Sequence, residues 1–382
     1  MPFEKTKFSQ KLPITPLTRR GAGKTYRICH EMQPEQKNLI VAFTHANIKN
    51  IQNELLKEHG KIPDATRIMT FDAFVYHMII RPYEKTIYNF FGQNYKFEKT
   101  SITLKKPPQQ RIKINGRYVP NKSYKKKDCL QHYMDERGQY YCETLSELAM
   151  YVKQGRESIV LTAAKRLNLF FDNILIDEFQ DFREHDYELI VKLSKCLKNI
   201  LLVGDYYQHS VSGQNNSGKP FKKSKTEIGY EEFIDELRGE RFDVDTNSLI
   251  YTRRCSEEIC SFIRDKLGIQ IQSARINAGT VIRPSNIQEI LDDKNIVKLV
   301  YDNASHYSFR AVNWSYSKGD TYDAACVILN GSTEKLVEDK FSVSTLKTVT
   351  LNKLYVALTR SKGDLYIVTQ DEFETVKEKY YK

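Results

Sequence analysis

The chain has 382 residues, 40% hydrophobic and 28% charged, as is ordinary for a soluble globular protein of two or three domains. Its seven cysteines are odd in number and form no CxxC pair, which argues against a disulfide framework or a zinc site. There is no signal-peptide pattern and no apolar run of the ~18 residues that a membrane span needs, so we expect a cytoplasmic protein. The net charge of +11 favours a polyanionic partner, although a solvated lysine-rich surface would give the same excess.

The first 60 residues alternate strand-like and helix-like segments. We expect a strand at 12–17, a loop at 21–23, a helix at 25–32, a strand at 38–44 and a helix at 46–58. The continuous apolar run at 38–44 is typical of a strand buried on both faces. Strand, loop, helix and strand in this order open a parallel α/β sheet.

The middle of the chain changes in character. Residues 81–160 include a basic, proline-containing and aromatic-rich stretch, which we interpret as an inserted subdomain with mobile loops. Two apolar runs that end in acid follow at 167–177 and 198–205, and then a polar loop rich in glycine and lysine. The last third adds β-like runs at 325–329 and 365–368 and helical segments at 256–267 and 348–358.

These segments predict an α/β protein with parallel sheets in two units. The predicted parts are an N-terminal part of the first unit at 1–80, the inserted basic subdomain at 81–160, the rest of the first unit at 161–245, and a second unit at 246–382.

A phosphate-binding loop is indicated by Gly21-Ala22-Gly23-Lys24-Thr25, between a predicted strand and a predicted helix. Glycines let backbone N–H groups close around phosphates at the positive end of a helix dipole. Lys24 would add a point charge, and the Thr25 hydroxyl would coordinate Mg²⁺. The match is imperfect, because Thr18 stands where the full pattern has glycine.

Acidic and amide side chains follow the two apolar runs. Asp177 and Glu178 stand at the end of the first, where Asp177 could hold Mg²⁺ and Glu178 could polarise the attacking water. A helix N-cap is the alternative use of such a pair. The second run ends in Val-Gly-Asp-Tyr-Tyr-Gln, in which Gln208 could sense a γ-phosphate. The three elements in this order predict hydrolysis of a nucleoside triphosphate.

With these elements in place, nearly the whole chain resembles the UvrD/Rep-type helicases of superfamily 1. Further segments that resemble family motifs are 43–47, 69–74, 251–255, 313–323 and 354–361, the last being close to "YVALTRA". The resemblance implies two RecA-like P-loop domains, with ATP in the cleft between them and 3′→5′ movement on a nucleic acid.

The resemblance also implies roles for individual residues at the nucleotide. The implied ATP-binding residues are Gly21, Ala22, Gly23, Lys24, Thr25, Tyr26, Arg253 and Gly319. The implied catalytic residues are Lys24, Glu178, Gln208, Arg254 and Arg360, with Thr25 and Asp177 at the metal. Arg254 and Arg360 would reach the γ-phosphate from the second domain. Tyr26 and Arg253 could sandwich the base or be ordinary surface residues.

A path for a single strand is implied as well. Its residues would be Thr44, His45, Thr70, Phe71, Trp314, Ser317 and Lys318. Trp314 could stack on a base or pack in the core. His209 and the lysines at 219–225 could contact the strand or be packed and solvated residues.

Several positions depart from the family pattern. The fifth motif has Ser315 in place of histidine and Thr321 in place of an acid. Only residues 255–312 separate Arg254 from Asn313, which leaves no room for the accessory domain of large members and resembles the compact UvrD-like ATPases. Two functions remain open: a translocase or weak helicase on single-stranded nucleic acid, with DNA favoured, or an ATP-driven regulatory subunit that controls a partner nuclease or effector, as in a phage-defence complex.

Overall fold

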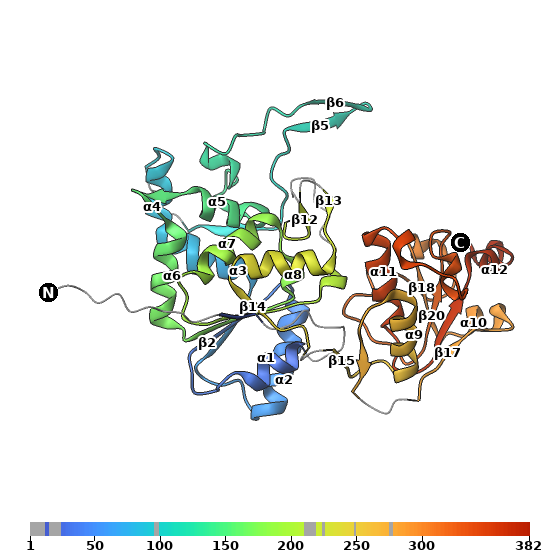
Figure 1. Cartoon of the computed structure of the whole chain (residues 1–382). Coiled ribbons are helices and arrows are strands. Elements are labelled where there is room, and N and C mark those ends of the chain that lie inside the picture. Colours follow the sequence, from blue (N-terminus) through green and yellow to red (C-terminus); the bar gives the residue numbers. More distant parts are fainter. Residues whose placement is uncertain are drawn as a thin grey trace.

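The computed structural model of the chain describes residues 12–14, 24–94, 99–209, 219–223, 226–247, 250–274 and 278–382. The described strands and helices form two α/β halves, each built on a parallel sheet (Figure 1). The predicted mixed α/β fold with parallel sheets is therefore confirmed. Among the described residues, no helix is long and apolar enough to cross a membrane.

The first sheet has four parallel strands in the order β11-β10-β2-β3. Their bounds are β2 Asn38–Ala42, β3 Thr66–Thr70, β10 Asn173–Asp177 and β11 Ile200–Val203. Beside β11, strand β1 (Leu12–Ile14) pairs in parallel with β14 (Phe242–Val244). Because the strands are parallel, the segments that follow β2, β3, β10 and β11 meet at one edge of the sheet, where ligands of α/β proteins bind.

Helices cover both faces of the first sheet. Helices α1 (Lys24–Glu31) and α2 (His45–His59) pack with Ile40 and Ala42 on one face, while Leu39 and Val41 join the larger core on the other. This alternation is the period of two expected of a strand. The second face is covered by α6 Ile159–Phe170, α7 Glu184–Ser194 and α8 Tyr230–Gly239.

The segment between β3 and β10 does not form a core of its own. It contains α3 Phe71–Phe74, a π-helix Val75–Ile80, α4 Glu84–Phe90, β4 Ser101–Thr103, β7 Gln139–Tyr141, α5 Leu145–Tyr151, β8 Lys153–Gln154 and β9 Glu157–Ser158. Its buried side chains, such as Tyr76, Tyr140 and Leu148, share one cluster with the first sheet. The antiparallel hairpin β5 (Arg111–Ile114) and β6 (Arg117–Pro120) instead stands clear of this core (Figure 1).

The second sheet has five parallel strands in the order β17-β21-β20-β18-β19. Their bounds are β17 Val281–Ile282, β18 Val297–Val300, β19 Ala311–Asn313, β20 Ala325–Ile328 and β21 Leu365–Val368. The helices of this half are α9 Glu257–Leu267, α10 Ile287–Asp292, α11 Thr348–Leu358 and α12 Gln370–Glu374. Four short strands complete the chain, β12 Lys222–Lys223, β13 Thr226–Glu227, β15 Tyr251–Thr252 and β16 Gln272–Ser273.

Most elements expected from the sequence are present within one or two residues. Helix α11 and strand β21 have the predicted bounds, and α1, α2, β2, α9 and β20 are close to theirs. The apolar run at 167–177 is divided between two elements, because its first residues end α6 and the strand begins at Asn173. An apolar run does not by itself separate a buried helix end from a buried strand.

The two halves contact each other at the carboxyl edge of the first sheet. Tyr207 packs against the cores of both halves, with its ring 5.7 Å from that of Tyr355 in α11. Lys318 of the second half places its Nζ 2.5 Å from Asp181 Oδ1 of the first. The candidate site described next therefore lies beside contacts between the halves.

Candidate nucleotide and nucleic-acid sites

Residues that are far apart in the sequence meet where α1 begins. Lys24 Nζ donates a hydrogen bond to Glu178 Oε2 at 2.7 Å, and Thr25 Oγ1 donates to Asp177 Oδ2 at 3.2 Å. Lys24 and Asp177 are buried. The end of the predicted phosphate loop thus lies against the predicted acidic pair. Gly21, Ala22 and Gly23 lie outside the described residues.

A sharp turn presents the acidic pair at the end of β10. Glu178 adopts φ 57° and ψ 40°, a left-handed conformation that is uncommon for residues other than glycine and that clusters at functional sites. Its backbone N–H donates to Asp177 Oδ1 at 2.9 Å. Gln180 fixes the turn, because its Nε2 donates to Glu178 Oε2 and its Oε1 accepts from the Asp205 N–H at 2.9 Å.

Glycine is required where β11 approaches this turn. A Cβ atom on Gly204 would lie 2.4 Å from Phe179 Cδ1 and 2.8 Å from Gln180 Oε1, too close for any side chain. The glycine of the Val-Gly-Asp segment therefore lets β11 pack directly against the acidic turn. Gln208 follows in the next turn, where it is buried and its Nε2 donates to the Asp205 carboxylate.

Burial and charge shift the ionisation of this cluster. Burial alone would lower the pKa of Lys24, but Glu178, Asp177 and Asp205 outweigh it and raise that pKa. Burial alone would raise the pKa of Glu178, but Lys24 and then Lys318 lower it to about 2. Burial and the neighbouring Glu178 charge together raise the pKa of Asp177. The site thus holds more carboxylate than its own lysine neutralises, which suits an added cation.

Tyr26 and Arg253 meet directly. The Arg253 guanidinium lies 4.1 Å from the centre of the Tyr26 ring, and the other face of that ring stacks on His30 at 3.4 Å. At this cation–π distance no base fits between the two side chains. The expected sandwich is therefore closed in this structure, and Tyr26 and Arg253 join the two halves instead.

The two arginines expected at the γ-phosphate lie in the second half. Arg254 is half-buried, and its Nη1 donates to the Thr359 carbonyl at 3.4 Å. Arg360 is fully buried, where its Nε donates to the Val356 carbonyl at 2.7 Å and its Nη1 to the Asp320 carbonyl at 3.4 Å. Arg360 Nη2 has no hydrogen-bond partner among the described residues. Gly319, in the adjoining loop, has φ 100°.

Three of the residues expected on the strand path are core residues. Phe71 is buried against Phe43 and Phe182, with ring centres 5.2 and 5.1 Å away. Trp314 is fully buried and its Nε1 donates to the Leu299 carbonyl at 2.9 Å, and Ser317 Oγ donates to the Trp314 carbonyl. The structure therefore contradicts the expected strand contacts of Phe71 and Ser317, because each side chain lies in the interior. For Trp314 it shows the core packing that the sequence left open as the alternative to base stacking.

The other strand-path candidates are more accessible. Thr44 and His45 are exposed at the start of α2, where Thr44 Oγ1 also accepts from the Asn47 N–H at 3.1 Å. Thr70 is half-buried and caps α3 by accepting from the Ala73 N–H. His209 is packed, with the centre of its ring 4.2 Å from that of Phe221. Packing was the alternative to strand contact that the sequence left open for this residue.

The loop around Lys318 holds two features that sequence reasoning missed. Lys318 pairs with Asp181 and so belongs beside the acidic turn, where it also lowers the pKa of Glu178. Tyr316 is 76% exposed, the most exposed aromatic side chain of this loop. Its place in the fifth motif, between Trp314 and Lys318, was the available signal in the sequence.

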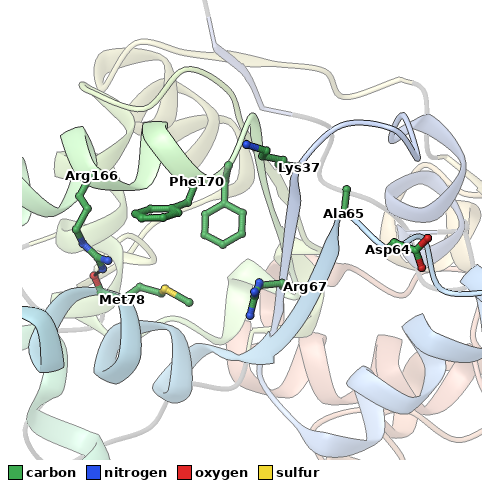
Figure 2. A pocket seen from close by; sticks show the side chains of 8 residues that line it. Lys37, Asp64, Ala65, Arg67, Met78, Arg166 and Phe170 are labelled. Carbon is green, nitrogen blue, oxygen red and sulfur yellow. Dashed lines mark hydrogen bonds between the residues drawn. The ribbon is translucent and has the colours of Figure 1, made fainter.

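A separate pocket lies at the opposite edge of the first sheet. It has a volume of about 460 Å³, and Figure 2 shows Phe170, Met78 and Arg166 along it with Lys37 and Arg67. Lys37 precedes β2 and Ala65 precedes β3, so the pocket is at the amino ends of the parallel strands. It is therefore distinct from the site at Lys24 and Glu178.

Comparison with known proteins gives one sequence match. Residues 93–210 match the family model of the UvrD/REP helicase N-terminal domain. This stretch is similar in sequence to the N-terminal domain of the UvrD/REP helicases. It contains the acidic turn and the Val-Gly-Asp segment, which confirms the resemblance found in the sequence. A comparison with curated protein sequences finds no match.

Among solved structures, the chain is similar to helicases of arteriviruses. Arterivirus nonstructural protein 10 shares 13% identity over 93% of this chain and 58% of its own, with a TM-score of 0.43. Its complex with DNA shares 11% identity over 94% of this chain and 60% of its own, with a TM-score of 0.44. The PRRSV helicase shares 12% identity over 96% of this chain and 53% of its own, with a TM-score of 0.42. The chain thus spans little more than half the length of these proteins. The superpositions are loose, so the resemblance to the UvrD/REP helicases rests on the sequence match.

Proposed function

We propose that this UvrD-like chain hydrolyses ATP with Mg²⁺ and uses the cycle to move along single-stranded nucleic acid, DNA in the first instance, in the 3′→5′ direction of the family it resembles. The observation that carries the proposal is the convergence of Lys24 and Thr25 with Asp177 and Glu178 at one buried point. The direction and the choice of ATP rest on the resemblance alone.

The donor set at this point suits a hydrated magnesium ion with a triphosphate. The Thr25 hydroxyl and the Asp177 carboxylate offer adjacent oxygen ligands of the kind Mg²⁺ prefers. When bound, the ion would neutralise charge that develops on the phosphates. Asp177, Glu178 and Asp205 exceed the positive charge that Lys24 supplies, which agrees with a cation completing the site.

Nucleotide binding would rearrange the ion pair seen here. Lys24 cannot serve a phosphate fully while its Nζ donates to Glu178, so phosphate oxygens would compete with the carboxylate for the lysine. Release from Lys24 would free Glu178 to accept a proton from water. Arg254 and the Nη2 of Arg360, which has no partner in the described part of the chain, would supply charge from the second half. This would couple hydrolysis to movement between the halves.

The ATPase rate with and without single-stranded DNA tests this function. We expect saturating oligonucleotide to raise kcat at least about tenfold, because strand contacts on both halves would favour the hydrolytic arrangement. The same assay with an RNA oligonucleotide separates the two strand types. ATP hydrolysis that neither strand stimulates would overturn the translocase and leave the regulatory ATPase as the function.

Tyr316 supplies a specific test of the strand path. Because it is 76% exposed beside Lys318, we expect Tyr316→Ala to weaken single-strand binding about tenfold, as for loss of one base-stacking aromatic. Fluorescence anisotropy with a labelled oligonucleotide measures the change. Phe170→Ala is the matched control, since Phe170 is also exposed but lies at the opposite edge of the first sheet (Figure 2). Equal affinities for both variants would remove Tyr316 from the path.

A further inference from the structure

The basic arm, residues 104–127, projects from the first half of the molecule (Figure 1). Its strands β5 and β6 pair Ile112 with Val119 and Lys113 with Tyr118. Asn115 and Gly116 close the hairpin with φ of 47° and 80°, the two left-handed residues of a type I′ turn. At about 3.3 Å per extended residue, the limb from residue 104 to this turn spans roughly 35 Å. The arm is thus a defined ribbon rather than a shapeless loop.

Most of the charge excess of the chain lies on this arm. It contains nine lysines and arginines and no aspartate or glutamate, so its charge of +9 accounts for nine of the eleven excess charges. Lys127 pairs with Glu147 at the base of the arm. The other eight cations form no ion pair with a carboxylate of the described residues. A convex element with this charge fits a polyanion.

The hairpin exposes two different faces. Directly paired residues share a face, which places Arg111, Lys113 and Tyr118 on one side and Ile112, Ile114, Val119 and Arg117 on the other. Ile114 is 50% exposed and Tyr118 67% exposed. A two-stranded ribbon with both faces in water is marginal by itself. Its exposed apolar side chains therefore indicate a surface that is covered when the arm is in use.

The shape of the arm favours a duplex over a single strand. Single strands are held in grooves by successive stacked aromatics, whereas the hairpin is convex and carries one aromatic, Tyr118. A two-stranded ribbon fits the major groove of B-form DNA, which is about 12 Å wide, with phosphates within reach on both sides. Exposed apolar side chains can contact thymine methyl groups there.

We propose that the basic arm is a binding element for double-stranded DNA, with the β5–β6 hairpin in the major groove and the cations of both limbs on the flanking phosphates. This binding needs no nucleotide and so does not depend on the ATPase proposed above. In a chain that moves along one strand, the arm would hold the duplex from which that strand emerges.

The triple variant Arg111→Ala/Lys113→Ala/Arg117→Ala tests the proposal. We expect its Kd for a blunt 20-base-pair DNA, measured by anisotropy without nucleotide, to rise at least about tenfold. The slope of log Kd against log salt should fall by about 2 to 3, as for three lost phosphate contacts. Single-strand affinity and ATPase rate should change by less than about twofold, because the hairpin lies outside the strand path and the nucleotide site.

Controls separate the arm from charge in general and from misfolding. Lys294→Ala/Lys335→Ala/Lys379→Ala removes the same charge from exposed positions of the second half and should leave duplex affinity unchanged. Replacing residues 105–124 by a short Gly-Ser linker should reproduce the loss, with an unchanged melting temperature. Wild-type duplex affinity in the arm variants would overturn the proposal. An equal loss of duplex and single-strand affinity would also overturn it, because the arm would then bind any polyanion.

Discussion

Glu178→Gln should lower kcat for ATP hydrolysis by about 10²- to 10⁴-fold while it strengthens ATP binding. The lower rate follows from loss of the carboxylate that would take a proton from the attacking water. The stronger binding follows from the ion pair at 2.7 Å, because a neutral glutamine no longer holds Lys24 away from the phosphates. A charge-assisted hydrogen bond is worth about 1.5 kcal/mol, so we expect Kd to fall by about tenfold.

Single-turnover hydrolysis and titration with a fluorescent ATP analogue measure the two effects separately. Glu231→Gln is the control, since Glu231 is an exposed glutamate of α8, away from the acidic turn. A Glu178→Gln protein with the wild-type rate would remove Glu178 from the role of proton acceptor. Weaker ATP binding in that variant would show that the Lys24–Glu178 pair does not compete with the nucleotide.

The elements that the sequence predicted well are those with uninterrupted apolar runs. Strands β2, β20 and β21 are such runs, and each is buried in a parallel sheet. Strand β18 was missed because Lys298 interrupts its apolar pattern. That lysine is fully buried, and its Nζ donates a hydrogen bond to the Asp293 carbonyl. The partner of its buried charge therefore lies in the loop before the strand, which the apolar pattern does not reveal. Strand β19 has only three residues, too few to show a period.

The sequence predicted which residues come together at the site, but not the directions in which their side chains point. Motif spacing placed Lys24, Thr25, Asp177 and Glu178 together, since carboxyl ends of parallel strands share an edge. A motif does not say which way a side chain faces, and Phe71 could have pointed to solvent or to Phe43 and Phe182. In the structure Phe71 packs in the core, and so does Trp314. The contact of Lys318 with Asp181 joins the two halves and is invisible to local reasoning.

Lys24→Ala should abolish measurable ATP binding and also destabilise the fold. The binding loss reflects removal of the charge that serves the phosphates. The stability loss arises because the buried Asp177 and Asp205 and the half-buried Glu178 lose their lysine. Breaking a buried ion pair from one side costs about 3–5 kcal/mol. The double variant Lys24→Ala/Glu178→Gln should recover much of the stability but none of the binding, which separates the two effects.

The pH dependence of unfolding tests whether Lys24 keeps the Glu178 carboxylate charged in the folded state. In the wild type the pKa of Glu178 is about 2, below its unfolded value near 4.3, so the pair stabilises the fold above pH ~4 and this contribution is lost as pH falls toward 2. Without Lys24, burial should raise the pKa of Glu178 above the unfolded value, and the folded state would then bind more protons than the unfolded state. The stability of Lys24→Ala should therefore fall as pH rises, so its deficit in urea unfolding should be larger at pH 8 than at pH 5. A deficit that does not change with pH would mean that the buried carboxylates do not depend on Lys24 for their charge.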